Sequence, residues 1–433
     1  SSCTWGIGVD AMSAVRLAAF ALGPSWQPQW QPRPGVSAPC RRSSSGGPPS
    51  PGRAGSCSPL ALLALSAASL TRAADSLRRR SPALCRAGVR IARRVAVAAA
   101  SSASVRAPEP FRTDDGAVLE VLGGPSTAPS DSPSVGQEAT VLLVHGSYHA
   151  AWCWDQHFLG FLRAAGFHTY AVSLRGQGRG TVVKANPVAG TLETHAADVA
   201  AVAKHLREVH GRRVAIVGHS FGSLIAQRAV ADLRLEGQDD VLAGLALLSG
   251  VPPNGIGSLA WRYVLRDLGL TWRITWGFAT RAFERDADLC RELFFDRDLP
   301  EETLREYMKE LSKSCPQGTR LLDLRALQSS LPVPAGADLP GSLPVLVFGG
   351  DSDVIVDGQA MEDSARANGV PFYITLEGVA HDAMLDSRWQ SAAEPLLSWL
   401  KALSDGPEAV AEWERRCLAG TGSARVVAVS PAT

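Results

Sequence analysis

The chain has 433 residues, of which 45% are hydrophobic and 20% are charged, values that are ordinary for a globular protein with a sizeable core. Its net charge of +1 hides an asymmetry: residues 1–110 carry 14 Arg, no Lys and three acidic residues, a net +11, whereas the remainder carries 29 basic and 39 acidic residues, a net −10. An acidic body without a basic stripe argues against a nucleic-acid partner.

Residues 1–107 form a leader rich in Ser, Ala, Pro, Gly and Arg, as in Arg41–Ser56. Such a composition cannot bury enough apolar surface to offset the entropy of folding, so we expect disorder. A Ser-rich, Arg-rich and acid-poor leader is typical of a transit peptide, which predicts import into the plastid, with the mitochondrion as the alternative. The apolar stretch Leu60–Leu70 is too short to span a bilayer, and no stable membrane span is expected.

Between residues 108 and 404, apolar runs that predict strands alternate with amphipathic patterns that predict helices. The predicted strands are Ala117–Leu122, Thr140–Gly146, His168–Leu174, Arg213–His219, Leu242–Gly250, Leu343–Gly350 and Pro371–Gly378. The predicted helices are Ala150–Ala165, Leu192–Val209, Phe221–Leu235, Gly358–Asn368 and Ala392–Leu403. This alternation predicts an α/β fold with a mostly parallel central sheet flanked by helices.

The alternation is interrupted at about residues 254–340, where we expect a helical cap insertion. This segment has no strand signal, a helical run at Glu301–Ser312, three Trp and four Phe. Most of these aromatic side chains are expected to pack the insertion onto the body, with one or two facing a pocket. Residues 405–433 are expected to form a loose C-terminal tail that includes a short helix.

The stretch Gly218-His219-Ser220-Phe221-Gly222 lies between a predicted strand and a predicted helix. Gly-x-Ser-x-Gly in this context is typical of the nucleophile elbow, a turn so tight that only glycine tolerates the neighbouring backbone. The pattern predicts Ser220 as a catalytic nucleophile.

A nucleophilic serine needs a base, and in this architecture the acid and then the histidine follow the serine in the chain. His381 is the only histidine after His219, and it follows the last predicted strand. Asp353 is the predicted acid because it follows the preceding strand with room for a turn; Asp351 is the reserve. The acid would hold the imidazole tautomer and stabilise the imidazolium.

An oxyanion hole needs two N–H donors. One is the backbone of Phe221, the residue after the nucleophile, and Ser147 is best placed to supply the other from the loop after an earlier strand. His145 and His149 flank Ser147 and have side chains that could serve as ligands or bases, but a His-Gly pair at the end of a strand favours a role in fixing the loop by hydrogen bonds.

The segments "VLLVHGSYHAAWCW", "VGHSFG", "VFGGDSD" and "GVAHDAML" together resemble the α/β-hydrolase superfamily over about Phe111–Ser404. They are most similar to plant methyl esterases, the related hydroxynitrile lyases, and plastid hydrolases of plants and algae. The resemblance implies an eight-stranded sheet, a helical cap and a Ser220, Asp353 and His381 triad. The lyases carry a hydroxyl-bearing residue and a lysine where this chain has Gly146 and Asp382, so cyanohydrin cleavage is not expected.

The sequence therefore predicts a serine hydrolase that cleaves a carboxylic ester of an apolar small molecule or lipid through an acyl-enzyme, without a metal or organic cofactor. A thioesterase or lipase is an alternative, because the same groups serve each of these substrates. A ligand receptor on the same scaffold, with slow or no turnover, is the alternative from another class.

Overall fold

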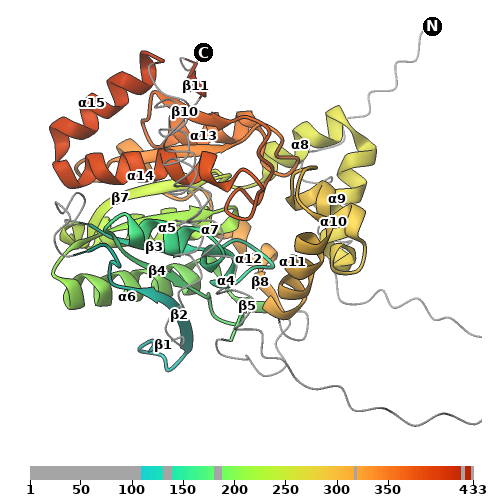
Figure 1. Ribbon diagram of the computed structural model, residues 1–433, viewed down its shortest axis with the longest axis horizontal. Helices are drawn as coiled ribbons and strands as arrows, with labels where there is room; N and C mark the ends of the chain where they lie inside the picture. The colour runs from blue at the N-terminus through green and yellow to red at the C-terminus, as the bar shows by residue number, and fades with distance from the viewer. Residues whose placement is uncertain (1–108, 130–138, 180–187, 316–318, 421–424, 431–433) are drawn as a thin grey trace, which may run out of the picture. The chain divides into compact units, whose positions relative to one another are not determined.

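The computed structural model describes residues 109–129, 139–179, 188–315, 319–420 and 425–430 (Figure 1). The predicted leader, residues 1–107, lies outside them. The described residues include a nine-stranded sheet in the order β1-β2-β4-β3-β6-β7-β9-β10-β11. The bounds of its strands are β1 Glu109–Arg112, β2 Val118–Gly124, β3 Ala139–Val144, β4 His168–Val172, β6 Arg213–His219, β7 Leu242–Leu248, β9 Val345–Gly350, β10 Phe372–Leu376 and β11 Arg425–Ala428.

The centre of the sheet is parallel and its edges are antiparallel. The six strands from β4 to β10 in spatial order run parallel, whereas β1, β2 and β11 pair antiparallel. All six residues of β3 are buried, as expected for a strand covered on both faces. Val141 and Leu143 enter one hydrophobic cluster and Leu142 and Val144 the other, because successive side chains point to opposite faces.

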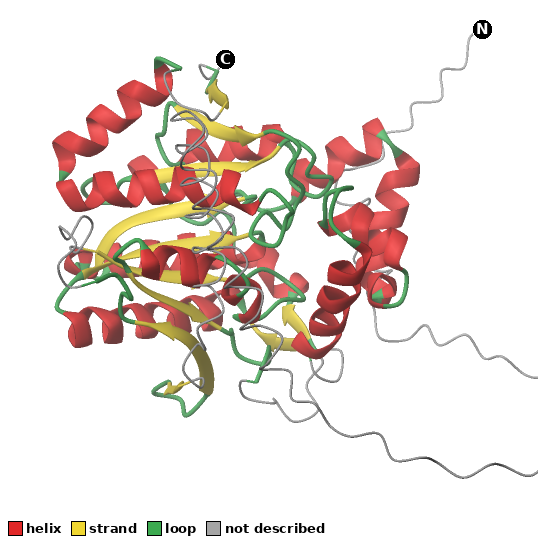
Figure 2. Ribbon diagram, viewed as in Figure 1, coloured by secondary structure: helices red, strands yellow, loops and turns green. Residues whose placement is uncertain are grey.

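Helices cover both faces of the sheet (Figure 2). One face packs against α4 (Trp152–Asp155), α5 (Phe158–Ala164) and α14 (Trp389–Asp405). The other packs against α6 (Leu192–His210), α7 (Phe221–Leu235) and α13 (Gly358–Ala367). The predicted helix Ala150–Ala165 is thus two helices, because His157 leaves helical geometry at φ −141° and its ring stacks on Trp389 at 4.7 Å.

Four helices of eight or more residues lie between β7 and β9 in the described chain, where the sequence predicts a cap: α8 (Gly257–Arg266), α9 (Leu268–Thr280), α10 (Ala287–Phe294) and α11 (Glu301–Ser314). The shorter elements are β5 (Val188–Gly190), β8 (Arg320–Leu322), α12 (Leu324–Leu327) and 3-10 turns at Asp239–Val241, Ala282–Glu284, Gln328–Ser330 and Gly336–Asp338. β5 and β8 pair with each other, so the segment contains a strand that its sequence did not indicate.

The aromatic side chains of this segment divide into two groups. Phe283, Phe294 and Phe295 are buried in the cluster that includes α5 and α14, as expected. Phe278 packs against the same cluster, so most of the seven aromatics pack as expected, whereas Trp261, Trp272 and Trp276 are 41%, 67% and 42% exposed. Trp272 and Trp276 belong to α9. This helix approaches α10 with its Gly277 side, where an added Cβ would lie 3.1 Å from Leu293, and its other faces are left in solvent.

The described residues after 405 pack on the sheet and on α14, unlike the loose tail that the sequence predicts, although the short helix expected there is present. Helix α15 (Pro407–Leu418) buries Trp413, whose ring lies 6.0 Å from Phe372 of β10 and whose Nε1 donates to Ser398 Oγ of α14 at 2.9 Å. β11 then pairs with β10, so the sheet has nine strands where the resemblance implies eight. Within the described part of the chain, none of the helices is both long and apolar enough to span a bilayer.

Candidate active site

Ser220 lies in the turn between β6 and α7. Its φ of 53° is a conformation that residues other than glycine rarely adopt. The turn also needs its two glycines, because a Cβ on Gly218 would lie 2.6 Å from Ser223 Cα and a Cβ on Gly222 would lie 2.3 Å from His145 O. These close backbone contacts are those of a nucleophile elbow, with Ser220 at the N-terminus of α7.

Asp353 and His381 form a hydrogen-bonded pair. His381 Nδ1 donates to Asp353 Oδ2 at 2.8 Å, and both side chains are buried. The second carboxylate oxygen, Oδ1, accepts from the backbone N–H groups of Ile355 at 2.7 Å and Val356 at 2.9 Å. The carboxylate is therefore fixed on both sides, and the imidazole is held in the tautomer that leaves Nε2 free to accept a proton.

The charge of the carboxylates also acts on the histidine. Burial alone would lower the pKa of His381, but the adjacent Asp353, through its charge and its hydrogen bond, and the nearby Asp382 together outweigh burial. The pKa of His381 is therefore raised above its ordinary value.

Asp351, the reserve acid, does not contact His381. Its side chain is exposed, and Oδ1 accepts from the backbone N–H of Gly378 at 2.8 Å. Its backbone N–H donates to Leu376 O, while Ser352 N–H donates to Val379 O, each at 3.1 Å. Asp351 therefore helps to join the loop after β9 to the loop after β10.

Ser220 and His381 come from the carboxyl ends of β6 and β10, at one end of the sheet. His219, the neighbour of the serine, donates from Nε2 to His381 O at 3.0 Å, and the two rings lie 4.8 Å apart. Within the described residues Ser220 makes no side-chain hydrogen bond to His381. Such bonds are often long before substrate binds.

The loop after β3 lies against Ser220, because a Cβ on Gly146 would be 2.7 Å from Ser220 Cβ. His145 holds this loop: Nδ1 donates to Gly146 O at 2.8 Å, and Nε2 accepts from Leu174 N–H at 3.0 Å. Burial lowers the pKa of His145 to about 3, so the ring is neutral. In the described part of the chain, the N–H groups of Ser147 and Phe221 have no backbone acceptor, and their role as oxyanion donors stays a prediction.

The sequence missed one feature of this site. His149 Nε2 lies 2.8 Å from Asp382 Oδ2, and both side chains are buried. The sequence assigned His149 to loop fixation and used Asp382 only as a contrast with the lyases. Their adjacency to Ser147 and His381 was the signal that could have linked them.

Among the described residues, His219, His381 and Asp382 bring potential metal ligand atoms within 4.8 Å of one another. His219 Nε2 already donates to His381 O, and His381 Nδ1 to Asp353, whereas the buried His219 Nδ1 and Asp382 Oδ1 have no hydrogen-bond partner among the described residues.

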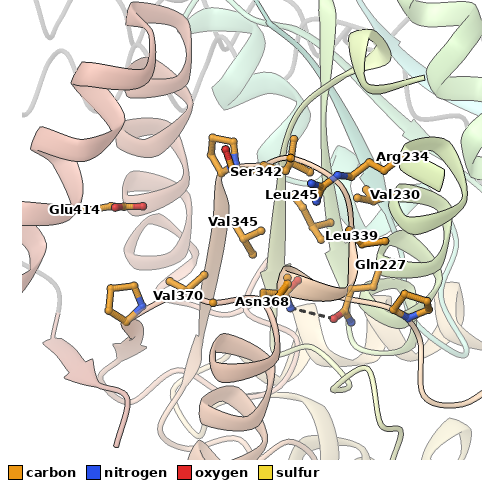
Figure 3. Close-up of a pocket in the computed structure, with 18 residues that line it drawn as sticks. Gln227, Val230, Arg234, Leu245, Leu339, Ser342, Val345, Asn368, Val370 and Glu414 are labelled. Carbon is orange, nitrogen blue, oxygen red and sulfur yellow. Dashed lines mark hydrogen bonds between the residues drawn. The ribbon is translucent and has the colours of Figure 1, made fainter. Parts of the chain in front are cut away.

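A cavity of about 310 Å³ lies elsewhere, near the amino ends of β9 and β10 (Figure 3). Its lining includes Gln227, Arg234, Leu245, Val345, Asn368 and Glu414, and it contains none of the predicted site residues. The cavity is thus separate from the carboxyl ends of the strands, where ligands bind in open α/β sheets.

The model of the alpha/beta hydrolase family matches residues 141–394, which is more than half of the chain. The chain belongs to the alpha/beta hydrolase family. The predicted fold class is thereby confirmed: a mostly parallel central sheet flanked by helices. The closer similarity to plant and algal enzymes stays a prediction.

The hydrolase is also similar to solved structures of low sequence identity. A thermophilic esterase from Thermogutta terrifontis is 21% identical, with 70% of this chain and 100% of that chain covered and a TM-score of 0.48. A bromoperoxidase from Bacillus anthracis is 19% identical, with 69% and 100% covered and a TM-score of 0.48. The epoxide hydrolase CorEH is 18% identical, with 69% and 100% covered and a TM-score of 0.47. No curated protein matches the sequence.

Proposed function

We propose that the hydrolase is a serine esterase that cleaves a carboxylic ester through an acyl-enzyme. The observation that carries the proposal is the buried hydrogen bond from His381 Nδ1 to Asp353 Oδ2, beside a serine on a nucleophile elbow. In this tautomer His381 Nε2 accepts the proton of Ser220 as Oγ attacks the ester carbonyl.

The tetrahedral intermediate places a negative charge on the former carbonyl oxygen. The N–H groups of Ser147 and Phe221 donate to this oxygen, and the N-terminus of α7 adds a favourable dipole. The C–O bond then breaks, and the alcohol leaves with the proton that His381 accepted. A water molecule, deprotonated by the same imidazole, attacks the acyl carbon and releases the carboxylic acid and Ser220.

The surroundings of the site favour an apolar substrate. The ring of Phe294 lies 6.4 Å from that of His381, and Tyr148 stacks on Phe278 at 5.5 Å. Helices α8 and α9 also expose five large apolar side chains: Trp261, Leu265, Leu268, Trp272 and Trp276. These features suit an ester with an apolar acyl or alcohol group, including lipid-like esters presented at an interface.

The test is turnover of a panel of p-nitrophenyl, methyl and thioester substrates of increasing acyl length. The wild type should complete many cycles with the longer oxygen esters, and Ser220→Ala should lose at least about 10⁴-fold in kcat. A single slow cycle with a ligand-dependent shift in Tm would instead support the receptor, and a preference for thioesters would support the thioesterase.

A further inference from the structure

A second buried pair of histidine and carboxylate lies beside the predicted triad. His149 and Asp382 are 1% and 0% exposed, and His149 Nε2 is 2.8 Å from Asp382 Oδ2. His149 belongs to the loop that contains Ser147, and Asp382 directly follows His381 in the chain. The mechanism proposed above uses neither side chain.

The hydrogen bonds of His149 indicate where its protons lie. Nδ1 is 2.8 Å from Ser147 O, and a carbonyl oxygen only accepts, so Nδ1 carries a proton. Nε2 faces the carboxylate of Asp382. Burial alone would raise the pKa of Asp382, but His149 and the more distant His219 and His381 outweigh burial, and this pKa is lowered. Both ring nitrogens of His149 therefore lie at hydrogen-bond distance from an oxygen atom, which fixes the ring between the Ser147 carbonyl and the Asp382 carboxylate.

The two histidines of the Ser147 loop hold consecutive carbonyl groups. In a trans peptide the C=O and N–H groups point in opposite directions. The bond from His145 to Gly146 O therefore sets the direction of the Ser147 N–H, and the bond from His149 to Ser147 O sets the next peptide. Tyr148 lies within this segment at φ 67°, a conformation that needs such support in a residue other than glycine.

Asp382 connects this loop to the catalytic histidine. It binds His149 through its side chain, while its N–H donates to Phe294 O at 2.9 Å. His381, the preceding residue, accepts from His219 through its backbone oxygen. The Ser147 loop, the His381 loop and the nucleophile elbow are thus joined by one continuous set of hydrogen bonds.

We propose that His149 and Asp382 are positioning residues, which hold the Ser147 donor and His381 in fixed relation and supply a negative charge that favours the imidazolium of His381 during turnover. This inference rests on the proposed serine esterase function. It adds a second carboxylate to the acid, base and nucleophile of the triad.

The other titratable groups around the pair and His381 are His145, His219, Asp353, Cys153 and Cys290. Burial lowers the pKa of His145 and His219 to about 3 and raises the pKa of both thiols, so these four groups are neutral at pH 7. The carboxyl groups that act on His381 are therefore those of Asp353 and Asp382.

Asp382→Asn and His149→Gln test the proposal, because each preserves a hydrogen-bonding group, and Asp382→Asn removes the carboxylate charge. In Asp382→Asn the acidic limb of kcat/KM should move to lower pH by roughly one unit, since His381 loses a neighbouring negative charge. Each variant should lose roughly 10-fold or more in kcat with a smaller change in KM, because a displaced oxyanion donor acts mainly on the transition state. The double variant should lose no more than the worse single variant.

Asp198→Asn is the matched control. Asp198 is also buried, at 2% exposure, and pairs with Arg175 on another part of the sheet. This variant should change Tm without moving the acidic limb. If Asp382 has a purely structural role, Asp382→Asn will likewise change Tm without moving the acidic limb of kcat/KM. That result would overturn the proposal.

A measurement on the wild type keeps the proposal testable if a variant does not fold. In protein labelled with ¹⁵N-histidine, His149 should carry a proton on Nδ1 that is hydrogen-bonded to Ser147 O, and an unprotonated Nδ1 would overturn the contact that fixes the Ser147 loop. Labelling of the wild type by a fluorophosphonate separates the two claims. An unlabelled and inactive wild type contradicts the esterase; a labelled wild type with additive losses in the double variant contradicts the positioning role.

Discussion

Replacing Asp353 with Asn changes one atom, and the structure predicts how the new amide will orient. Asp353 Oδ1 accepts from the N–H groups of Ile355 and Val356, so the amide oxygen must take this position. The amide NH2 group then faces His381 Nδ1, where Asp353 Oδ2 now accepts at 2.8 Å. Two donors cannot face each other, so His381 must adopt the tautomer with its proton on Nε2.

The wrong tautomer cannot accept the proton of Ser220. We therefore expect kcat to fall by roughly 10⁴-fold with KM changed little, which corresponds to about 5.5 kcal/mol of transition-state stabilisation. The assay is steady-state hydrolysis of a p-nitrophenyl ester, with circular dichroism and Tm to verify folding. Asp351→Asn is the matched control and should retain activity, because Asp351 is exposed and contacts Gly378. A loss below 10-fold in Asp353→Asn, or a larger loss in Asp351→Asn, would refute this reasoning.

Three further predictions follow from the geometry. Gly222→Ala should lower the free energy of unfolding by at least about 3 kcal/mol in urea denaturation, because the new Cβ would lie 2.3 Å from His145 O and 2.7 Å from Val144 O. A change below about 0.5 kcal/mol would contradict the close contact. In the wild type, kcat/KM should fall with decreasing pH, and the midpoint of this fall should lie above the ordinary imidazole pKa of about 6.5. The reason is that His381 must be neutral to act as a base and its pKa is raised. A midpoint below about pH 6 in the pH profile of kcat/KM would contradict this. Trp413→Ala should cost about 3 kcal/mol, measured by chemical denaturation, because the side chain is buried against Phe372; an unchanged stability would mean that α15 does not pack on β10.

The sequence predicted best those elements for which several independent sequence patterns indicate the same local structure. β6 and α7 have the predicted bounds, because an apolar run, two glycines and an amphipathic helix all specify the same turn at Ser220. The edge strands β1 and β11 were missed because each has four residues and is specified by its pairing partner rather than by its own periodicity.

Side-chain pairing in the site was only partly accessible from sequence. Chain order was enough to propose Asp353 and His381, which the structure brings within 2.8 Å, although their catalytic role stays a prediction. The pair of His149 and Asp382 is separated by 233 positions, and no periodicity relates two such residues. Their places beside Ser147 and His381 were the signal in the sequence, and the two side chains meet because parallel strands bring the loops after β3 and β10 to one end of the sheet.

The most direct test of the esterase mechanism is rapid-quench mass spectrometry during hydrolysis of a slow ester. The peptide that contains Ser220 should gain the mass of the acyl group within the first turnover and lose it at the rate of kcat, and Ser220→Ala should gain none. Hydrolysis that proceeds with the acyl group on another residue, or that continues unchanged in Ser220→Ala, would contradict the mechanism.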